Sequence, residues 1–277
     1  MYKVFCAALI AIAASFATGV LDAHSQGGTM PDTATAEIAK ELAPSGTLRA
    51  ALNFGNPVLV QRDPATNEPR GVTVDLAREL ARRLNVALEF VPFEAAGKVF
   101  EGLKTSSWDI AFLAIEPVRA AEIAFTAPYV IIEGVYLVPK DSKLRRIEEV
   151  DRVGVRIGVN KGSAYDLFLT RTLKHAQLRR GENGIELFRK GGLEAAAGVK
   201  QPLVEYAKNH LDVRIMDGRF MEIRQAIGTP RVRLDGREAV PRYLHAFLEE
   251  MKASGFIAQA LARSNQPDAA VAPAAGG

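Results

Sequence analysis

Residues 108–130 read WDIAFLAIEPVRAAEIAFTAPYV, and this stretch decides the fold. The run 109–115 is almost continuously apolar, which is expected of a strand that is buried on both faces of a sheet. A proline then favours the start of a short helix, and Arg119 follows one helical turn beyond the strand. Ligands bind at the carboxyl ends of strands in open α/β sheets, and arginine offers a planar fork that matches a carboxylate. Arg119 could equally pair with Glu116 or Glu122 on the surface, so the stretch alone leaves both interpretations open.

Outward from this stretch, strands and helices alternate along most of the chain. Short apolar runs predict strands at 47–52, 87–92, 109–115, 130–138, 155–159, 195–199 and 213–216. Helical periodicity predicts helices at 73–84, 95–105, 163–172, 185–190, 202–209, 241–254 and 256–262, with a short helix from residue 117. Strands that alternate with helices indicate an α/β fold with mostly parallel sheets.

The N-terminal segment has the features of a secretory signal. Lys3 provides a positive start, residues 4–21 are apolar apart from small Ser, Thr and Gly, and residues 23–25 (AHS) place small residues where a signal peptidase reads. We therefore predict a signal peptide at 1–25, cut after Ser25, and a periplasmic location. The apolar run is also long enough to suit an uncleaved N-terminal anchor.

The segments that flank the predicted folded part have compositions typical of linkers. Residues 26–45 are rich in Gly, Pro, Thr, Ala and Asp, and we predict a tether there with at most one short helix, at 36–42. Residues 265–277 are rich in Ala, Pro and Gly and are predicted to be a disordered tail.

Several kinds of chemistry are disfavoured by the residues present. The single cysteine, Cys6, lies in the predicted signal, so the mature chain would have no disulfide, cysteine metal site or thiol nucleophile. His175, His210 and His245 are isolated, and no HExxH or GxSxG motif occurs. The net charge of +3 comes from scattered Lys and Arg, which indicates solvated surfaces and not a nucleic-acid interface. These absences disfavour an enzyme, and we expect neither a metal nor a cofactor.

A second candidate position for ligand chemistry is the segment 160–166, NKGSAYD. A predicted strand ends there, glycine turns the chain, and Ser163 with Asp166 forms an approximate capping box at a helix start. Free backbone amides at such a start form a natural anion site, although an ordinary capped helix has the same pattern.

A third candidate position is the loop 53–57, which follows the first predicted strand. The amide of Asn53 could hydrogen-bond a ligand, and Phe54 could cover it. The alternative is a turn with a locally packed phenylalanine.

Taken in order, five segments resemble the bacterial extracellular solute-binding proteins of family 3, the polar amino-acid type. The central segment looks like the family's DxxxAxxxITxxRxxxxxFTxPY pattern. The five segments are GTLRAALNF (46–54), GVTVDLARELARRL (71–84), WDIAFLAIEPVRAAEIAFTAPYV (108–130), IGVNKGSAYDLFL (157–169) and FLEEMKASGFIAQAL (247–261). The resemblance therefore covers nearly the whole predicted folded part.

This resemblance implies a type II periplasmic-binding fold with two α/β lobes that are joined by two hinge strands. Lobe 1 would comprise 46–138 plus 230–264, and lobe 2 would comprise 141–225. A small carboxylate-bearing ligand, an amino acid or related organic acid, would be captured between the lobes as they close. The protein, expected to be a monomer, would deliver the ligand to the membrane permease of an ABC transporter.

The resemblance also implies roles for particular residues. Arg119 would grip the carboxylate of the ligand, and Gly162, Ser163 and Ala164 would present backbone amides to the same group from lobe 2. Phe54 would cover the apolar part of the ligand. The predicted lining is completed by Asn53, Ile115, Glu116 and Val199.

The chain departs from the family pattern at the position that would bind an ammonium group. The segment GGLEAAAGV matches the family's GxxDAxxxD, whose last aspartate grips the ammonium of an amino acid, but Val199 stands there. A buried ammonium without a carboxylate is costly. Glu116, which stands where the family has a threonine, could supply that carboxylate or could simply pair with Arg119. We therefore favour an amino acid or a close relative, with a plain organic acid as the alternative.

Two other functions remain open on this resemblance. A dehydratase of the cyclohexadienyl (prephenate/arogenate) type has a similar fold and would need a general acid facing the cleft, for which Glu116 and Glu194 are the candidates. A sensor that acts through a separate membrane partner is also compatible, because the sequence contains no output domain of its own.

Overall fold

The computed structural model describes residues 33–276, so the predicted signal at 1–25 lies outside the described residues. Its strands are β1 (Thr47–Asn53), β2 (Gln61–Arg62), β3 (Pro69–Arg70), β4 (Ala87–Phe93), β5 (Ile110–Ala114), β6 (Ile123–Phe125), β7 (Val130–Pro139), β8 (Arg156–Asn160), β9 (Gln177–Gly181), β10 (Ala195–Val199), β11 (Val213–Ile215), β12 (Met221–Pro230) and β13 (Ala270–Val271). Its helices are α1 (Thr33–Leu42), α2 (Val72–Leu84), α3 (Ala96–Glu101), α4 (Pro117–Ala120), α5 (Ala164–Thr172), α6 (Gly184–Gly191), α7 (Lys200–Lys208), α8 (Arg231–Leu234), α9 (Ala239–Ala253) and α10 (Phe256–Arg263), with a 3-10 turn η1 (Ile147–Glu149).

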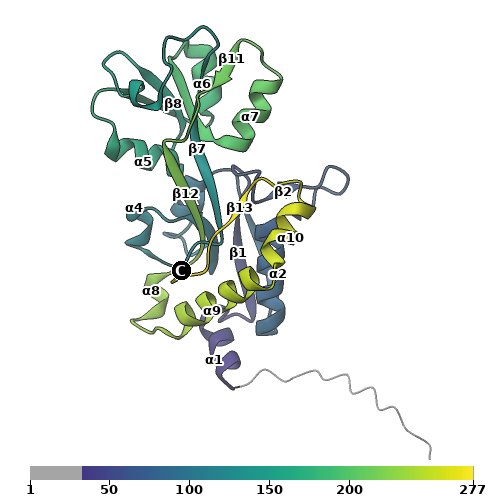
Figure 1. Cartoon of the computed structure of the whole chain (residues 1–277). Coiled ribbons are helices and arrows are strands. Elements are labelled where there is room, and N and C mark those ends of the chain that lie inside the picture. Colours follow the sequence, from purple (N-terminus) through teal and green to yellow (C-terminus); the bar gives the residue numbers. More distant parts are fainter. Residues whose placement is uncertain (1–32, 277) are drawn as a thin grey trace, which may run out of the picture. The chain divides into compact units, whose positions relative to one another are not determined.

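Two parallel groups of strands flank an antiparallel centre (Figure 1). The main path of the sheet runs β4-β1-β5-β12-β7-β10-β8-β9. β1 is parallel to β4 and β5, and β8 is parallel to β9 and β10, whereas β12 and β7 are antiparallel to each other. The parallel groups need crossover helices, which accounts for the alternation of strands and helices in the sequence.

β7 and β12 form the antiparallel centre of the sheet and join the two parallel groups. The carboxyl-terminal part of β12 pairs with β5, through Gln225–Gly228, and its amino-terminal part pairs with β7. β7 pairs with β12 through Val130–Gly134 and with β10 through Gly134–Leu137. Figure 1 shows both strands passing from one lobe to the other. The predicted fold class, two α/β lobes joined by two strands, is confirmed.

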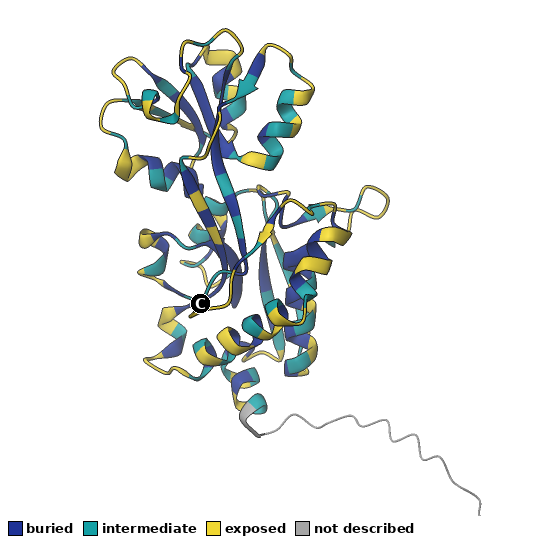
Figure 2. Cartoon of the chain, viewed as in Figure 1, coloured by how far each residue is buried: buried dark blue, intermediate teal, exposed yellow. Residues whose placement is uncertain are grey.

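Buried apolar side chains form the core of lobe 1. Leu76, Leu80 and Leu84 of α2 are 0 to 2% exposed, and each buried leucine contributes about 1.5–3 kcal/mol. Every residue of β5 is buried, as its apolar run predicts, and Trp108 just before it donates its indole N–H to the carbonyl of Val99 at 2.9 Å. Figure 2 shows the buried residues concentrated in the central strands and on the inner faces of the helices.

The segment predicted as a tether is partly folded onto the adjacent lobe. α1 covers Thr33–Leu42, and the side chains of Ile38 and Leu42 are 7% and 2% exposed. These two residues lie four positions apart and so share one helix face, which packs against α9 and α2. The sequence predicted at most one short helix here, at 36–42, and α1 ends at the predicted residue but begins three residues earlier.

The prediction of a disordered tail at 265–277 is wrong over much of its length. β13 pairs antiparallel with Val130 and Ile131 of β7, and the amide of Ala272 donates to the carbonyl of Tyr129 at 3.0 Å. Ala269 and Ala272 are 6% and 3% exposed. β10 pairs with β7 only from Gly134 onward. The first residues of β7, before Gly134, therefore remain available to pair with a short strand of small residues.

Removal of residues 265–277 is expected to lower the midpoint of thermal unfolding by roughly 3–8 °C, because a few backbone hydrogen bonds of about 1 kcal/mol each are lost. The measurement is calorimetry or circular dichroism of the two chains. A matched control that ends after Pro273 keeps β13 and the bond from Lys252 Nζ to the Pro273 carbonyl at 2.8 Å, and should unfold like the full chain. Equal midpoints for both truncations would show that β13 does not stabilise the fold.

The described part of the chain offers no obvious membrane span or metal site. No helix among residues 33–276 is long and apolar enough to cross a bilayer. The same residues contain no cluster of three or more His, Cys, Asp or Glu side chains arranged to hold a metal ion.

Candidate ligand site at the lobe junction

Arg119 lies in α4, immediately after the carboxyl end of β5, and its residue is 0% exposed. Nη1 donates to the carbonyl of Ala114 at 3.1 Å, and Nη2 donates to the carbonyl of Gly162 at 2.8 Å. The Nε atom is buried and has no hydrogen-bond partner among residues 33–276. A guanidinium carries five N–H donors, so the two bonds to carbonyls leave part of its hydrogen-bonding capacity unused.

The electrostatic surroundings of Arg119 leave its charge poorly compensated. Burial lowers the pKa of the guanidinium to about 10, although the charge of Glu116 acts in the opposite direction. At neutral pH the group is therefore protonated, and it lies in a site of low polarity. A bound anion would supply the compensation that the protein itself lacks.

Arg119 borders a cavity of about 40 Å³ between the lobes. Lobe 1 contributes the loop after β1, the residues before α3 and the end of β5, while β12 contributes Ile223 and Gln225. Lobe 2 contributes the start of α5 and Val199 at the end of β10. Of the predicted site residues, the cavity is lined by Asn53, Arg119, Ser163, Ala164 and Val199.

The start of α5 forms the wall opposite β5, and its hydrogen bonds differ from the prediction. Ser163 caps the helix by accepting from the amide of Asp166 at 3.1 Å. The amide of Gly162 donates to Asp166 Oδ2 at 2.8 Å, and the amide of Ser163 donates to the Asn160 carbonyl at 3.1 Å. Two of the three amides predicted to face the ligand are thus already engaged.

The amides that remain at this helix start are those of Ala164 and Tyr165. Neither has an acceptor among residues 33–276, and both residues line the cavity. Tyr165 is 8% exposed, and burial raises the pKa of its hydroxyl to about 12. The helix start can therefore donate to an anion, one residue further along than the sequence indicated.

Four other predicted residues lie outside the cavity lining: Gly162, whose amide donates to Asp166, and Phe54, Ile115 and Glu116. Phe54 is half-buried and packs beside Val60 and Val74, with the guanidinium carbon of Arg62 4.0 Å from its ring centroid. Ile115 donates its amide to the Arg224 carbonyl at 2.9 Å and extends the pairing of β5 with β12. The alternative interpretation of Phe54, a locally packed ring, is the one that fits the structure.

Glu116 is also outside the cavity lining. Its residue is 2% exposed, and its carboxylate forms an ion pair with Arg171 in the last turn of α5. The carboxylate therefore neither pairs directly with Arg119 nor reaches into the cavity, which removes the basis for assigning it to a ligand ammonium.

Two buried amide side chains that were not predicted from the sequence also line the cavity. Asn56 and Gln225 are each 5% exposed, and Asn56 Oδ1 has no partner among the described residues. Asn56 lies in the loop 53–57, so the loop was identified but not the residue. Gln225 is a polar residue inside the mostly buried second half of β12, and a buried polar side chain in such a strand is the signal that could have revealed it.

The two lobes touch directly around this cavity. Arg119 bonds the Gly162 carbonyl, and Glu116 pairs with Arg171, so lobe 1 is linked to lobe 2 at two points. Gly162 has a φ of +73°, and a Cβ added there would lie 2.9 Å from the Cα of Gly97 in α3. Only glycine permits so close an approach of the two backbones. The lobes are therefore in contact around the cavity.

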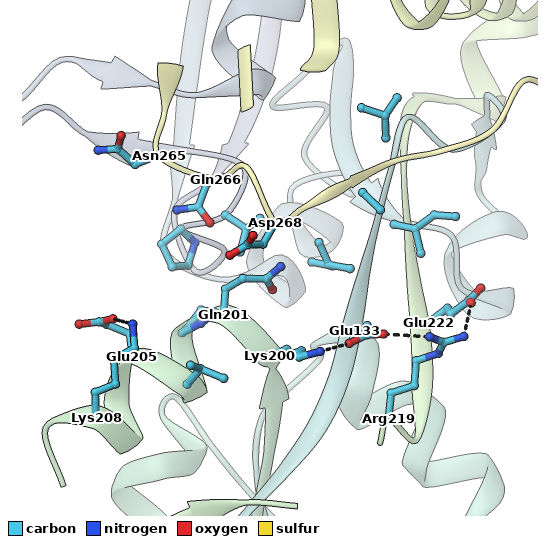
Figure 3. Close-up of a pocket in the computed structure, with 18 of the residues that line it drawn as sticks. Glu133, Lys200, Gln201, Glu205, Lys208, Arg219, Glu222, Asn265, Gln266 and Asp268 are labelled. Carbon is cyan, nitrogen blue, oxygen red and sulfur yellow. Dashed lines mark hydrogen bonds and ion pairs between the residues drawn. The ribbon is translucent and has the colours of Figure 1, made fainter. Parts of the chain in front are cut away.

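A second, larger cavity of about 830 Å³ lies beside β7, α7 and the C-terminal segment (Figure 3). Its charged residues are largely paired with one another: Glu133 bonds Lys200 at 2.6 Å and Arg219 at 2.8 Å, and Arg219 also bonds Glu222 at 2.8 Å. None of the predicted site residues lines this cavity.

Comparison with known proteins gives a consistent result. A family model described as bacterial extracellular solute-binding proteins, family 3, matches residues 52–264. A probable histidine-binding protein from Neisseria gonorrhoeae is 27% identical over 256 residues, which cover 88% of this chain and 91% of that protein.

Solved structures also share the fold. The amino acid ABC transporter substrate-binding protein AbpA from Streptococcus pneumoniae, bound to L-arginine, matches with a TM-score of 0.68 at 18% identity, over 82% of this chain and 98% of that one. An ancestral amino acid-binding protein, described as a precursor of cyclohexadienyl dehydratase, matches with a TM-score of 0.65 at 24% identity, over 81% of this chain and 98% of that one.

Proposed function

This chain belongs to the bacterial extracellular solute-binding proteins of family 3, and we propose that it captures a small carboxylate-bearing ligand between its lobes and delivers it to an ABC transporter. The ligand would lie between lobe 1, at 46–138 and 230–264, and lobe 2, at 141–225. We place the protein in the periplasm as a monomer that docks on a membrane permease, in keeping with its family.

The observation that carries this proposal is the buried guanidinium of Arg119. A cation with no directly bonded carboxylate in the described structure is unfavourable unless an anion binds it, and the planar fork suits the two oxygens of a carboxylate. The amides of Ala164 and Tyr165 reach the same cavity from the other lobe. A carboxylate held from both sides would give closure its driving force, because only the closed state offers all of these donors.

The dehydratase alternative receives less support from the cavity. Glu116 is engaged by Arg171. Glu194 accepts from Arg156, with Nη2 2.8 Å from Oε1, and this hydrogen bond holds the pKa of Glu194 below its usual value despite the opposing effect of burial. Neither carboxylate lines the cavity, so neither is positioned there as the general acid that a dehydration requires.

Binding of a carboxylate is tested by thermal unfolding of the purified chain with a panel of small carboxylates and their uncharged amides. A true ligand at one hundred times its dissociation constant stabilises by about 2.7 kcal/mol, which raises the unfolding midpoint by roughly 5–11 °C. The matching amides should give no shift. A panel in which no carboxylate raises the midpoint more than its amide would contradict the proposal.

The ion pair between Glu116 and Arg171 is expected to hold the lobes closed. Arg171→Ala leaves the buried Glu116 carboxylate without its partner in the closed state only, so we expect the dissociation constant to rise roughly three- to tenfold, for about 1 kcal/mol. Small-angle scattering of the ligand-bound variant should show a larger radius of gyration than for the parent. Arg179→Ala is the matched control, since Arg179 bonds Gln177 within lobe 2 and its loss should change neither quantity.

A further inference from the structure

The charges that line the small cavity are all of one sign. Arg119 contributes a buried cation, the exposed Lys161 is the other charged residue of the lining, and no Asp or Glu is part of it. The acidic groups around it are committed elsewhere: Glu116 pairs with Arg171, and the carboxylate of Asp166 accepts from the Gly162 amide and from Arg180 Nε at 2.8 Å each. A ligand ammonium would therefore enter a site that has positive charge and no free carboxylate, which is an unfavourable environment for a cation.

The uncharged groups of the lining favour a neutral second polar group on the ligand. The side-chain oxygen of Asn56 is buried and unpartnered among the described residues, and Gln225 adds a second amide at the same cavity. The free Asn56 Oδ1 accepts a hydrogen bond and so suits a ligand hydroxyl, whereas the N–H₂ group of an amide such as Gln225 donates and suits a keto or hydroxyl oxygen. An unsatisfied buried acceptor is costly, which makes Asn56 an indicator of ligand chemistry and not of packing.

The remaining lining limits the size of the ligand. Leu113, Val199 and Ile223 form apolar parts of the wall, and the cavity is small, at about 40 Å³. The two lobes must move slightly apart to accommodate any organic ligand. A ligand with a long side chain would require the largest separation of the lobes.

On the premise of the proposed function, we infer that the ligand is a small 2-hydroxy or 2-oxo carboxylate without an ammonium group. Arg119 binds its carboxylate, and Asn56 and Gln225 form hydrogen bonds with its hydroxyl or keto oxygen. Val199 determines this selectivity by withholding a carboxylate from the wall. The site thus disfavours the ammonium group of an α-amino acid but still binds the carboxylate.

Titration calorimetry of the full chain with matched compounds tests this inference. Lactate, pyruvate and alanine share a three-carbon skeleton, and 2-hydroxyisovalerate, 2-oxoisovalerate and valine share a branched one. We expect the best hydroxy or oxo acid to bind at least tenfold more tightly than the amino acid of the same skeleton. Equal or tighter binding of the amino acids would overturn the inference and leave the proposed function intact, whereas no binding of any of the compounds would count against both.

Val199→Asp provides an independent measurement of the same idea. Val199 is the N-cap residue of α7, with an extended backbone at φ −68° and ψ 137°, and aspartate is favoured at that position, so the variant should fold. The new carboxylate should shift the affinity ratio of hydroxy acid to amino acid by at least tenfold towards the amino acid. Val199→Asn is the uncharged control of the same shape and should leave the ratio near the parental value. An unchanged ratio in a folded Val199→Asp variant would show that charge at this wall does not set selectivity.

Discussion

Replacement of Arg119 by alanine is expected to remove ligand binding almost completely. Truncation of one partner of a buried charge pair costs about 2–5 kcal/mol, which corresponds to a rise in the dissociation constant of at least thirtyfold. Lysine should not restore affinity, because it is a point charge without the planar fork and cannot reproduce the two bonds to the Ala114 and Gly162 carbonyls together. Calorimetric titration of both variants with the best ligand of the parent measures the effect.

The binding defect of the Arg119 variants can be separated from a folding defect. Arg119 pays a desolvation penalty that lowers its pKa, so its removal relieves that penalty while it leaves two carbonyls without a donor. We expect the unfolding midpoint without ligand to change by only a few degrees, with a normal circular dichroism spectrum. A variant that binds as tightly as the parent would refute the role of Arg119 as the carboxylate clamp.

The parts of the fold that the sequence predicted are those fixed by local periodicity. β10 has the predicted limits, Ala195–Val199, and α2 differs from its prediction by one residue. β12 was missed as an element, although Met221 and Ile223 alternate with polar residues in its first half. Its partners are far away in the chain: Gly228 pairs with Ala111. Pairing between such distant residues leaves no signal in the local sequence pattern. Only the family resemblance implied that two strands cross between the lobes.

The site was predicted to the level of segments but not of individual groups. Strand ends and a helix start bring Arg119 and the α5 amides together, because the carboxyl ends of parallel strands meet at one edge. Which amides are free depends on the rotamer of Asp166, whose carboxylate turns back to Gly162. The partner of Glu116 is Arg171, 55 residues later. Neither contact can be predicted from the spacing of residues in the sequence. The first changes which amides can bind the carboxylate of the ligand, and the second removes Glu116 as a partner for a ligand ammonium.

Asp109 is expected to be a main determinant of stability in lobe 1. Its residue is 1% exposed, and its carboxylate accepts from the Arg49 amide at 2.8 Å, from the Arg49 guanidinium at 2.7 and 3.1 Å, and from Arg233. Its own carbonyl accepts from Thr229 Oγ1 at 3.1 Å. These contacts join β1, β5, β12 and α8. Asp109→Ala should cost about 3 kcal/mol, because it leaves buried donors and partly buried cations without a partner, and should lower the unfolding midpoint by roughly 6–12 °C.

The contribution of Asp109 should also depend on pH in a definite direction. Burial alone would raise the pKa of this carboxyl, but hydrogen bonds from Arg49 and Arg233 outweigh it and hold the pKa below its usual value. Since the folded pKa is lower than the unfolded one of about 3.9, the stabilisation is complete above the unfolded pKa and is lost as pH falls through the folded pKa. The difference in unfolding midpoint between the parent and Asp109→Ala should therefore be constant from pH 8 to about pH 5 and shrink below about pH 4. Asp212→Ala removes an exposed carboxylate that pairs with Arg189. Its pKa is lowered in the same direction, but because the pair is exposed to solvent, the loss and its pH trend should both be much smaller than for Asp109→Ala. A constant difference down to pH 3 would mean that packing, and not the ionised carboxylate, accounts for the effect of Asp109.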